Sequence, residues 1–297
     1  MVQIKKNKVN IINFLLVLIG LFIFYRITQK SEFNYFLNRV NHYFLFSFFF
    51  FFLSIYSASI RFYIILKKKI NILEILLLNI KSFFFYFFLP VGIGSDIYRF
   101  QILNKDLNKK KIQIFNIILI DRLFGLISFI FLSSFFFIFV IENYFLFPLL
   151  ILFPIIFFGF DKILNHFESL RINYFNELRL KEILCVSFFS VLSQIFLIIS
   201  IYLVILLYDF NFHFFHTGFV ISFSSILSLI PLSLFGLSAT ELSSYTLYIF
   251  YGLNNNEALF LTINHYFLKF SFSIVGVILY LKHNIRINFS IRGKKLK

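Results

Sequence analysis

Two short stretches of the sequence place helix-breaking residues and charged residues inside otherwise apolar segments. In the first, LPVGIGSDIYRF, the breakers Pro90, Gly92 and Gly94 precede Asp96 and Arg99. A charge inside a bilayer costs roughly 2.5–3.5 kcal/mol on insertion scales, so it needs a partner or a purpose. Glycine turns and helix N-termini expose backbone N–H groups that bind anions. The first stretch therefore predicts a polar site in the membrane for a phosphate or another anionic group.

The second stretch, IPLSLFGLSATELSS, repeats this layout with Pro231, Gly236 and Glu241. Each stretch is followed along the chain by an apolar segment that carries ionisable residues. These are Asp121 and Arg122 after the first stretch, and His265 and Lys269 after the second. Paired segments interrupted by Gly or Pro in corresponding halves of a chain are typical of transporter binding sites. The pattern predicts a degenerate repeat with a binding site between its halves.

The predicted substrate-binding residues are the glycines and ionisable residues of these segments: Gly92, Gly94, Asp96, Arg99, Asp121, Arg122, Glu241, His265 and Lys269. The predicted structural breaks are Pro90, Pro231 and Gly236. We expect Arg122, Lys269 and the N–H groups of the glycine turn to line a cationic pocket, while the carboxylates balance its charge. Neighbouring residues of a helix project in different directions, so Asp121 and Arg122 each need a partner on another helix. The alternative is that the charged residues form buried structural ion pairs, for instance Arg122 with Glu241.

Other polar residues have simpler interpretations. Arg61 and Lys81 lie near the ends of apolar segments or turns, and we expect both to snorkel toward the headgroups. His213 and His216 have a spacing that suits a metal, but no third ligand lies near them in the sequence. We therefore expect no metal at these histidines. We also expect no cofactor and assign no catalytic residue.

The elements that must position these residues are membrane helices. The chain of 297 residues is 60% hydrophobic and only 14% charged, with a mean hydropathy of +0.89, which excludes a soluble globule. Apolar runs long enough for a bilayer recur near 9–25, 43–66, 112–141, 143–160, 183–208, 213–235 and 257–281. We expect an all-α, polytopic integral membrane helix bundle of about 7–8 spans with two broken or re-entrant segments.

We expect one transmembrane domain over 1–297. Its first half covers about 9–141 with a break at 81–96, its second half covers about 143–281 with a break at 231–241, and a basic cytoplasmic tail follows at 282–297.

The net charge of +15 lies mainly in the loops between the apolar runs. Basic loops face the cytoplasm, where anionic lipid attracts them, so the charge predicts membrane topology rather than nucleic-acid binding. The rule places both termini in the cytoplasm and the protein in the plasma (inner) membrane. It also places the basic clusters on either side of 70–91 on one side of the membrane. One crossing cannot satisfy both clusters, so 70–91 is predicted to enter the membrane and return, beside a polar cavity.

LPVGIGSDIYRF, followed by IILIDRLFGLISF, resembles the membrane region of bacterial lysylphosphatidylglycerol synthases and related stand-alone flippase-like proteins. That family shows a Pro-Gly-Gly-Asp-x-x-Arg pattern, then Leu-Asp-Arg-Leu-x-Gly-Leu, and a second motif Pro-x-x-x-Gly-Leu-x-x-x-Glu. The matching positions are Pro90, Gly92, Gly94, Asp96, Arg99, Asp121, Arg122, Gly125, Pro231, Gly236, Leu237 and Glu241. The second motif departs from the family at Phe235 and at 238–240, where glycines are more usual.

The resemblance implies the flippase-like half of such proteins, and we expect no aminoacyl-transferase domain. The first hypothesis is a flippase-like protein that binds an anionic or glycosylated lipid headgroup and moves it between leaflets. Two alternatives stay open: a membrane-embedded transferase acting on polyprenyl-linked sugars, and a non-transporting scaffold of a complex that makes cell-envelope lipids. The expected partner is a membrane lipid or lipid-linked glycan, with no nucleic acid. Partner enzymes of envelope lipid biosynthesis and the oligomeric state stay open.

Overall fold

The structure is a computed structural model that describes residues 42–88, 94–107, 110–142, 179–227, 233–234 and 237–281. Within these ranges the chain forms helices α3 (His42–Ile65), α4 (Ile72–Phe88), α5 (Gly94–Asp106), α6 (Lys111–Ile141), α8 (Leu180–Leu207), α9 (Phe214–Leu227), α10 (Ala239–Phe250) and α11 (Asn255–Leu281). Strands β1 (Ser233–Leu234) and β2 (Leu237–Ser238) pair antiparallel. The predictions at 9–25, 143–160 and 282–297, and those at Pro90, Gly92, Pro231 and Gly236, lie outside the described residues.

Among the described residues, four helices are long and apolar enough to cross a membrane: α3, α6, α8 and α11. A helix needs about 20 apolar residues to span the roughly 30 Å hydrocarbon core, and these helices hold 24, 31, 28 and 27 residues. Large apolar side chains such as Phe49, Phe137 and Phe188 stay exposed on their outer faces. The predicted all-α polytopic membrane bundle is confirmed, and the chain is a multi-pass membrane protein.

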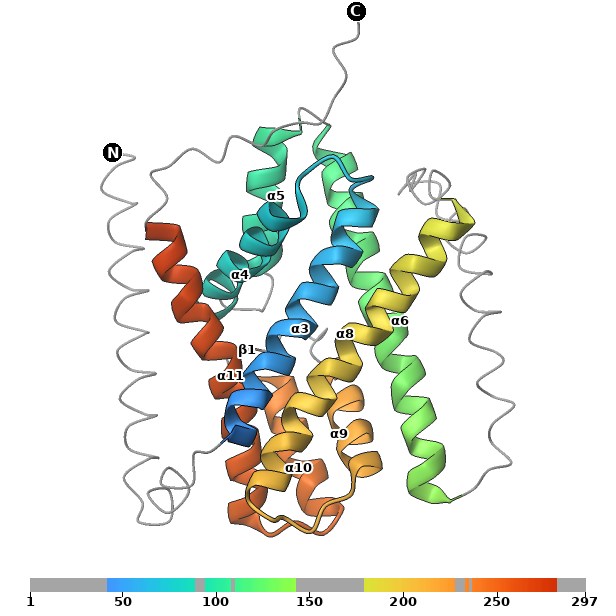
Figure 1. Cartoon of the computed structure of the whole chain (residues 1–297), viewed down its shortest axis with the longest axis vertical. Coiled ribbons are helices and arrows are strands. Elements are labelled where there is room, and N and C mark those ends of the chain that lie inside the picture. Colours follow the sequence, from blue (N-terminus) through green and yellow to red (C-terminus); the bar gives the residue numbers. More distant parts are fainter. Residues whose placement is uncertain are drawn as a thin grey trace, which may run out of the picture.

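The short helices come in two consecutive pairs. Helices α4 and α5 hold 17 and 13 residues, and helices α9 and α10 hold 14 and 12 residues. The two helices of each pair pack against each other. In Figure 1, α4 and α5 lie in the upper half of the bundle, and α9 and α10 lie in the lower half. The two pairs therefore occupy opposite ends of the bundle.

Packing between the two halves of the chain is reciprocal. Helix α3 packs on α8, α4 packs on α11, and α6 packs on α9. If α3 to α6 are exchanged in order for α8 to α11, the α3–α8 contact maps onto itself, and the α4–α11 and α6–α9 contacts map onto each other. The contact between α3 and α4 likewise maps onto the contact between α8 and α9. A two-fold internal repeat generates this order of contacts, and the placement of the two short pairs at opposite ends of the bundle fits an inverted one (Figure 1). The repeat stays a prediction, and this packing is the observation that supports it.

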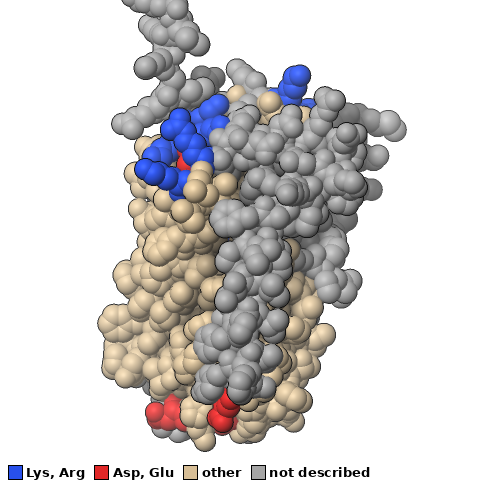
Figure 2. All heavy atoms as spheres, turned by 90° about the vertical axis from the view of Figure 1, so that its right-hand side faces the viewer, with Lys and Arg blue, Asp and Glu red and all other residues tan. Residues whose placement is uncertain are grey.

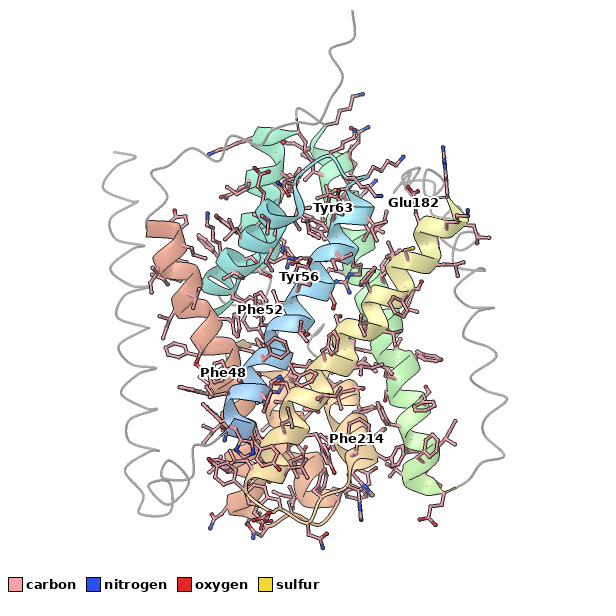
Figure 3. All side chains as sticks on the ribbon, viewed as in Figure 1. Phe48, Phe52, Tyr56, Tyr63, Glu182 and Phe214 are labelled. Carbon is pink, nitrogen blue, oxygen red and sulfur yellow. The ribbon has the colours of Figure 1, made fainter. Side chains whose placement is uncertain are left out.

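Small residues allow the helices to approach closely. Where α3 crosses α8, the Oγ of Ser200 donates to the carbonyl oxygen of Ser47 at 2.8 Å. Where α11 crosses α4, a Cβ on Gly276 would lie 2.5 Å from the carbonyl oxygen of Ile80, so no larger residue fits without a shift. Figure 3 shows Phe48 and Phe52 side by side along α3, and both rings stack on Phe272 of α11. Hydroxyl, glycine and aromatic contacts together hold the long helices around the two short pairs.

Charge is separated along the bundle. Figure 2 shows Lys and Arg gathered at its upper end, and Asp and Glu at its lower end. The exposed basic residues of the loops that join α3 to α4 and α5 to α6 include Lys68, Lys69 and Lys110. The exposed acids Glu142 and Asp209 lie just beyond the C-terminal ends of α6 and α8, at the other end of the bundle. The structure thus places the basic clusters on either side of α4 and α5 at the same end of the bundle.

Candidate binding site

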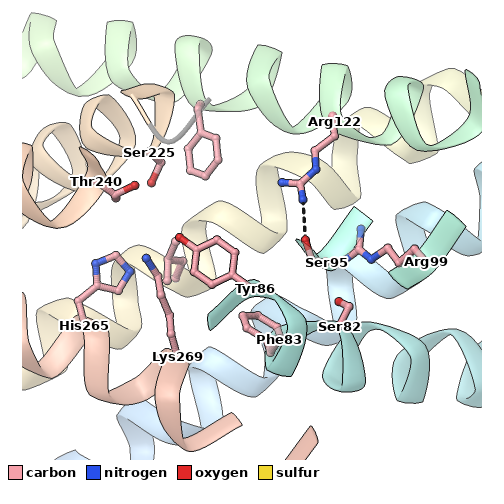
Figure 4. A pocket seen from close by; sticks show the side chains of 12 residues that line it. Ser82, Phe83, Tyr86, Ser95, Arg99, Arg122, Ser225, Thr240, His265 and Lys269 are labelled. Atoms are coloured by element: carbon pink, nitrogen blue, oxygen red, sulfur yellow. Dashed lines mark hydrogen bonds between the residues drawn. The ribbon is translucent and has the colours of Figure 1, made fainter. Parts of the chain in front are cut away.

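A cavity of about 260 Å³ lies between the two short helix pairs and the long helices. Its lining comes from both halves of the chain: Ser82, Phe83, Tyr86, Ser95, Arg99, Arg122, Phe129, Leu197, Ser225, Thr240, His265 and Lys269. Figure 4 shows Arg122, Ser95 and Arg99 on one side of Tyr86. His265 and Lys269 lie on the other side. Four of the predicted substrate-binding residues therefore line one cavity: Arg99, Arg122, His265 and Lys269.

Arg122 is held by the start of α5. Its Nε donates to Asp96 Oδ2 at 2.9 Å and its Nη2 donates to Asp96 Oδ1 at 2.8 Å, which makes a bidentate pair. Nη2 also donates to the Oγ of Ser95 at 3.0 Å (Figure 4). Asp96 lies in the first turn of α5, where the helix dipole favours a negative charge. Gly94, another predicted site residue, is the buried first residue of the same helix.

Lys269 is held in the same way by the start of α10. Its Nζ lies 2.7 Å from Glu241 Oε1, and Glu241, in the first turn of α10, is only 2% exposed. In both halves the acid lies in the first turn of a short helix, and its basic partner lies on the next long helix. The partner follows the acid by 26 positions in the first half and by 28 in the second. A hydroxyl residue precedes each acid, Ser95 in one half and Thr240 in the other.

Asp121 belongs to a second, buried cluster, which Arg99 connects to Asp96 at 3.9 Å. Its Oδ1 accepts from Arg61 Nε at 2.7 Å, and its Oδ2 lies 3.4 Å from Arg99 Nη1. Arg61 also donates to Ser190 on α8 at 3.4 Å. A Cβ on Gly125 would lie 3.4 Å from Arg61 Nη1, so the glycine leaves room for the guanidinium. This cluster ties α3, α5, α6 and α8 together, and its member Arg99 also lines the cavity.

The prediction that Arg61 snorkels to the headgroups is wrong. Arg61 is 7% exposed and points into the bundle, because Asp121 and the space above Gly125 give its charge a buried partner. Lys81 is also buried, at 3% exposed, and does not line the cavity.

The suggested pair of Arg122 with Glu241 is wrong as well. Each of these residues pairs within its own half of the chain, Arg122 with Asp96 and Glu241 with Lys269. The expectation that Asp121 and Arg122 take partners on other helices is confirmed.

His265 lines the cavity one helical turn before Lys269 and is 1% exposed. Within the described part of the chain, neither ring nitrogen has a hydrogen-bond partner. The Nε of Arg99, also on the cavity wall, likewise has no hydrogen-bond partner there. Two residues of the cavity wall therefore hold buried polar atoms whose hydrogen-bonding capacity the described protein residues do not use.

Sequence reasoning missed the neutral lining of the cavity. Ser82, Phe83 and Tyr86 come from α4, and Phe129, Leu197 and Ser225 come from α6, α8 and α9. Only Ser95 and Thr240 had a signal in the sequence, since each directly precedes a predicted acid. Among the described residues, no group of three His, Cys, Asp or Glu side chains is placed to hold a metal ion.

Comparison with known proteins gave one match. A family model described as the lysylphosphatidylglycerol synthase TM region matches residues 10–276. Neither the curated proteins nor the solved structures gave a match. The family expected from the two motifs is thereby confirmed over most of the chain.

Proposed function

Because the chain belongs to the lysylphosphatidylglycerol synthase TM region family, we propose that it is a flippase-like protein. It binds an anionic or glycosylated lipid headgroup in the cavity and moves it between leaflets. The observation that carries the proposal is the cavity itself, which lies between two opposed short helix pairs and has a cation from each half on its wall.

The chemistry of the cavity suits an anionic headgroup. Arg122 and Lys269 face it, each held by a carboxylate at the start of a short helix. Arg99 adds a second guanidinium whose Nε has no hydrogen-bond partner among the described residues. Guanidinium groups bind phosphate oxygens through planar pairs of N–H donors, the geometry in which Arg122 now holds Asp96. A phosphate entering the cavity takes the place of that carboxylate or accepts from Arg99.

The size of the cavity suits a headgroup rather than a whole lipid. Its volume of about 260 Å³ is smaller than the roughly 300–1,000 Å³ of drug-sized ligand pockets. Tyr86 and Phe83 form its apolar wall beside the cations. The headgroup enters while the acyl chains stay in the surrounding bilayer.

The short helix pairs supply the mechanism of movement. We take α4 with α5 as a re-entrant hairpin from the basic end of the bundle, and α9 with α10 as its inverted counterpart from the acidic end. The basic end is cytoplasmic by the positive-inside rule, and the protein lies in the plasma (inner) membrane with both termini in the cytoplasm. The whole chain acts as a single transmembrane domain. Rocking of one half against the other opens the cavity first to one leaflet and then to the other.

Reconstitution in liposomes tests this proposal. Fluorescent lipids with phosphate, aminoacyl-phosphate and glycosyl headgroups are measured for arrival in the opposite leaflet, with Arg122→Ala and Glu241→Gln beside the wild type. Lys111→Ala is the matched control, because Lys111 is exposed at the start of the same helix as Arg122. We expect movement of one headgroup class, lost in both site variants and kept in the control. If the wild type moves none of the three classes, the protein is not a flippase for them, and the scaffold and transferase hypotheses replace the proposal.

A further inference from the structure

The two ion pairs of the site differ in their capacity to exchange a proton. An arginine stays protonated at every ordinary pH, so Arg122 keeps its charge whether or not it holds Asp96. The second pair joins Lys269 to Glu241, and both a lysine and a carboxylate change protonation when a buried partner is lost. The side chain of Glu241 is only 2% exposed, whereas that of Asp96 is 21% exposed. The same ligand therefore has different consequences for the two carboxylates.

An anion in the cavity competes with both carboxylates. Arg122 and Lys269 line the same cavity of about 260 Å³, so a phosphate inside it lies near both cations. If the phosphate takes Arg122, Asp96 still has a guanidinium beside it, because Arg99 Nη1 lies 3.9 Å from Asp96 Oδ1. If the phosphate takes Lys269, the buried Glu241 gives up its ion-pair partner. A buried carboxylate that gives up its cation binds a proton, because an uncompensated buried charge is too costly.

His265 offers a hydrogen-bond partner for that proton. The ring is 1% exposed, lines the cavity one helical turn before Lys269, and lies close enough to Glu241 to interact with it electrostatically. Neither ring nitrogen has a hydrogen-bond partner among the described residues. A carboxylate has no proton to donate, whereas a protonated carboxyl group donates to the accepting nitrogen of a neutral imidazole. The unused ring nitrogens thus fit a state in which Glu241 carries a proton.

Among the described residues, the other titratable side chains near Glu241 carry no charge at about pH 7. Helices α9 and α11 and strand β2 pack against α10, and β2 has no titratable side chain. His216 of α9 packs on Tyr251, past the end of α10 that lies far from Glu241. The remaining groups are phenols and one buried imidazole beside an ammonium, which are neutral at this pH: Tyr86 of α4, Tyr245 and Tyr248 of α10, and His265 and Tyr266 of α11. Lys269 and Glu241 are therefore the pair whose charge the anion changes.

We propose that binding of an anionic headgroup in the cavity is coupled to protonation of Glu241, with one proton taken up for each anion. Lys269 turns from Glu241 to the anion, and a proton from solvent replaces it on the carboxylate. The negative charge of the ligand and the positive charge of the proton enter together, so the net charge of the buried site does not change. Release of the anion returns Lys269 to Glu241 and frees the proton, which links movement of the lipid to a proton gradient. This inference rests on the proposed binding of an anionic lipid headgroup, and it adds the ion that is bound with it.

Calorimetric titration of the purified full chain in detergent counts the protons. The probe is dioctanoyl phosphatidylmethanol, whose phosphodiester carries a negative charge and whose headgroup has no other titratable group. Repeating the titration in two buffers with different heats of ionisation gives the number of protons taken up with each lipid. We expect about one proton per lipid near pH 7, and an affinity that weakens by up to about tenfold for each unit rise in pH.

Two variants assign the proton to one carboxylate. Glu241→Gln imitates the protonated side chain, and we expect it to bind the probe without proton uptake and with an affinity that does not change with pH. Asp96→Asn is the matched control, because it neutralises the equivalent acid of the first half, and we expect it to keep an uptake of about one proton per lipid. The helical circular dichroism signal of each variant is compared with that of the wild type to show that it is folded.

The outcomes separate the two proposals. Binding of the probe by the wild type without proton uptake, or uptake that persists in Glu241→Gln, overturns the coupling and leaves the flippase proposal standing. Loss of uptake in Asp96→Asn as well overturns the assignment of the proton to Glu241. No binding of the probe by the wild type overturns both the coupling and the proposed site for an anionic headgroup.

Discussion

Neutralising Asp121 tests how much its buried pair with Arg61 stabilises the bundle. Asp121 is 3% exposed and receives Arg61 Nε at 2.7 Å, while Arg99 Nη1 lies 3.4 Å away. Asp121→Asn removes the anion but keeps the size of the side chain. Arg61, 7% exposed, is then a buried cation without a charged partner.

The cost of this change follows from burial. Removing one member of a buried ion pair costs about 3–5 kcal/mol, since the remaining charge stays out of water. Here two features reduce the loss: asparagine still offers an oxygen acceptor, and Arg99 keeps Asp96 at 3.9 Å. We expect a loss of about 3 kcal/mol in the free energy of unfolding. The double variant Arg61→Met/Asp121→Leu replaces the pair by apolar groups, and we expect it to regain most of that loss.

Denaturant titration of the protein in micelles, monitored by the circular dichroism signal of its helices, measures these differences in the free energy of unfolding. Glu142→Gln is the matched control, because it removes an exposed carboxylate just beyond the end of the same helix, and we expect a change within about 0.5 kcal/mol. If Asp121→Asn unfolds like the control, the pair does not stabilise the bundle. If the double variant is less stable than the single variant, the charge pair itself is required and the reasoning from burial fails.

Two further predictions concern the helix crossings. Gly276→Ala puts a Cβ 2.5 Å from a carbonyl oxygen of α4, so we expect the free energy of unfolding to fall by about 1–3 kcal/mol in the same titration. Gly252→Ala is the control, because a Cβ on this exposed turn residue meets no atom within 4 Å and adds only the strain of its positive φ. A Gly276→Ala protein as stable as the wild type contradicts the close approach of α11 to α4. Ser200→Ala removes the donor to the Ser47 carbonyl at 2.8 Å, and we expect a loss of about 0.5–1.5 kcal/mol. Adding Ser47→Ala to that variant costs little more if the two hydroxyls act as one unit, and a fully additive loss contradicts their contact at 3.1 Å.

The sequence predicted charges inside the bundle at Asp121 and Glu241, which are buried, but it did not predict the burial of Arg61 and Lys81. Nor did it predict how the charged residues pair. Arg122 pairs with Asp96 rather than with Glu241 because α5 returns along α6, and that return depends on packing between segments far apart in the chain. The layout of each half, with an acid at a short helix start and a base on the following helix, was visible in the sequence. The sequence did not show that the acid and the base of each half pair with each other.

Arg61 shows why a rule for single residues fails inside a bundle. An arginine near the end of an apolar segment snorkels when lipid surrounds it. Here α6 brings Asp121 and Gly125 against it, so a buried pair replaces the headgroup contact. The neutral residues that line the cavity could not be predicted from the sequence for another reason. Serines and aromatic residues occur throughout the chain, and only the fold selects Ser82, Tyr86 and Ser225 for the cavity.

Access to the cavity from the two sides of the membrane tests the central claim most directly. Leu197 lines the cavity without joining either ion pair, so Leu197→Cys in a Cys185→Ser background reports access alone. In oriented vesicles, a membrane-impermeant thiol reagent is applied to one side or the other, with Lys68→Cys and Glu142→Cys as controls for the two ends of the bundle. We expect Leu197→Cys to react from both sides, while each control reacts from one side. Reaction of Leu197→Cys from a single side under every lipid condition would contradict a cavity that opens to both leaflets.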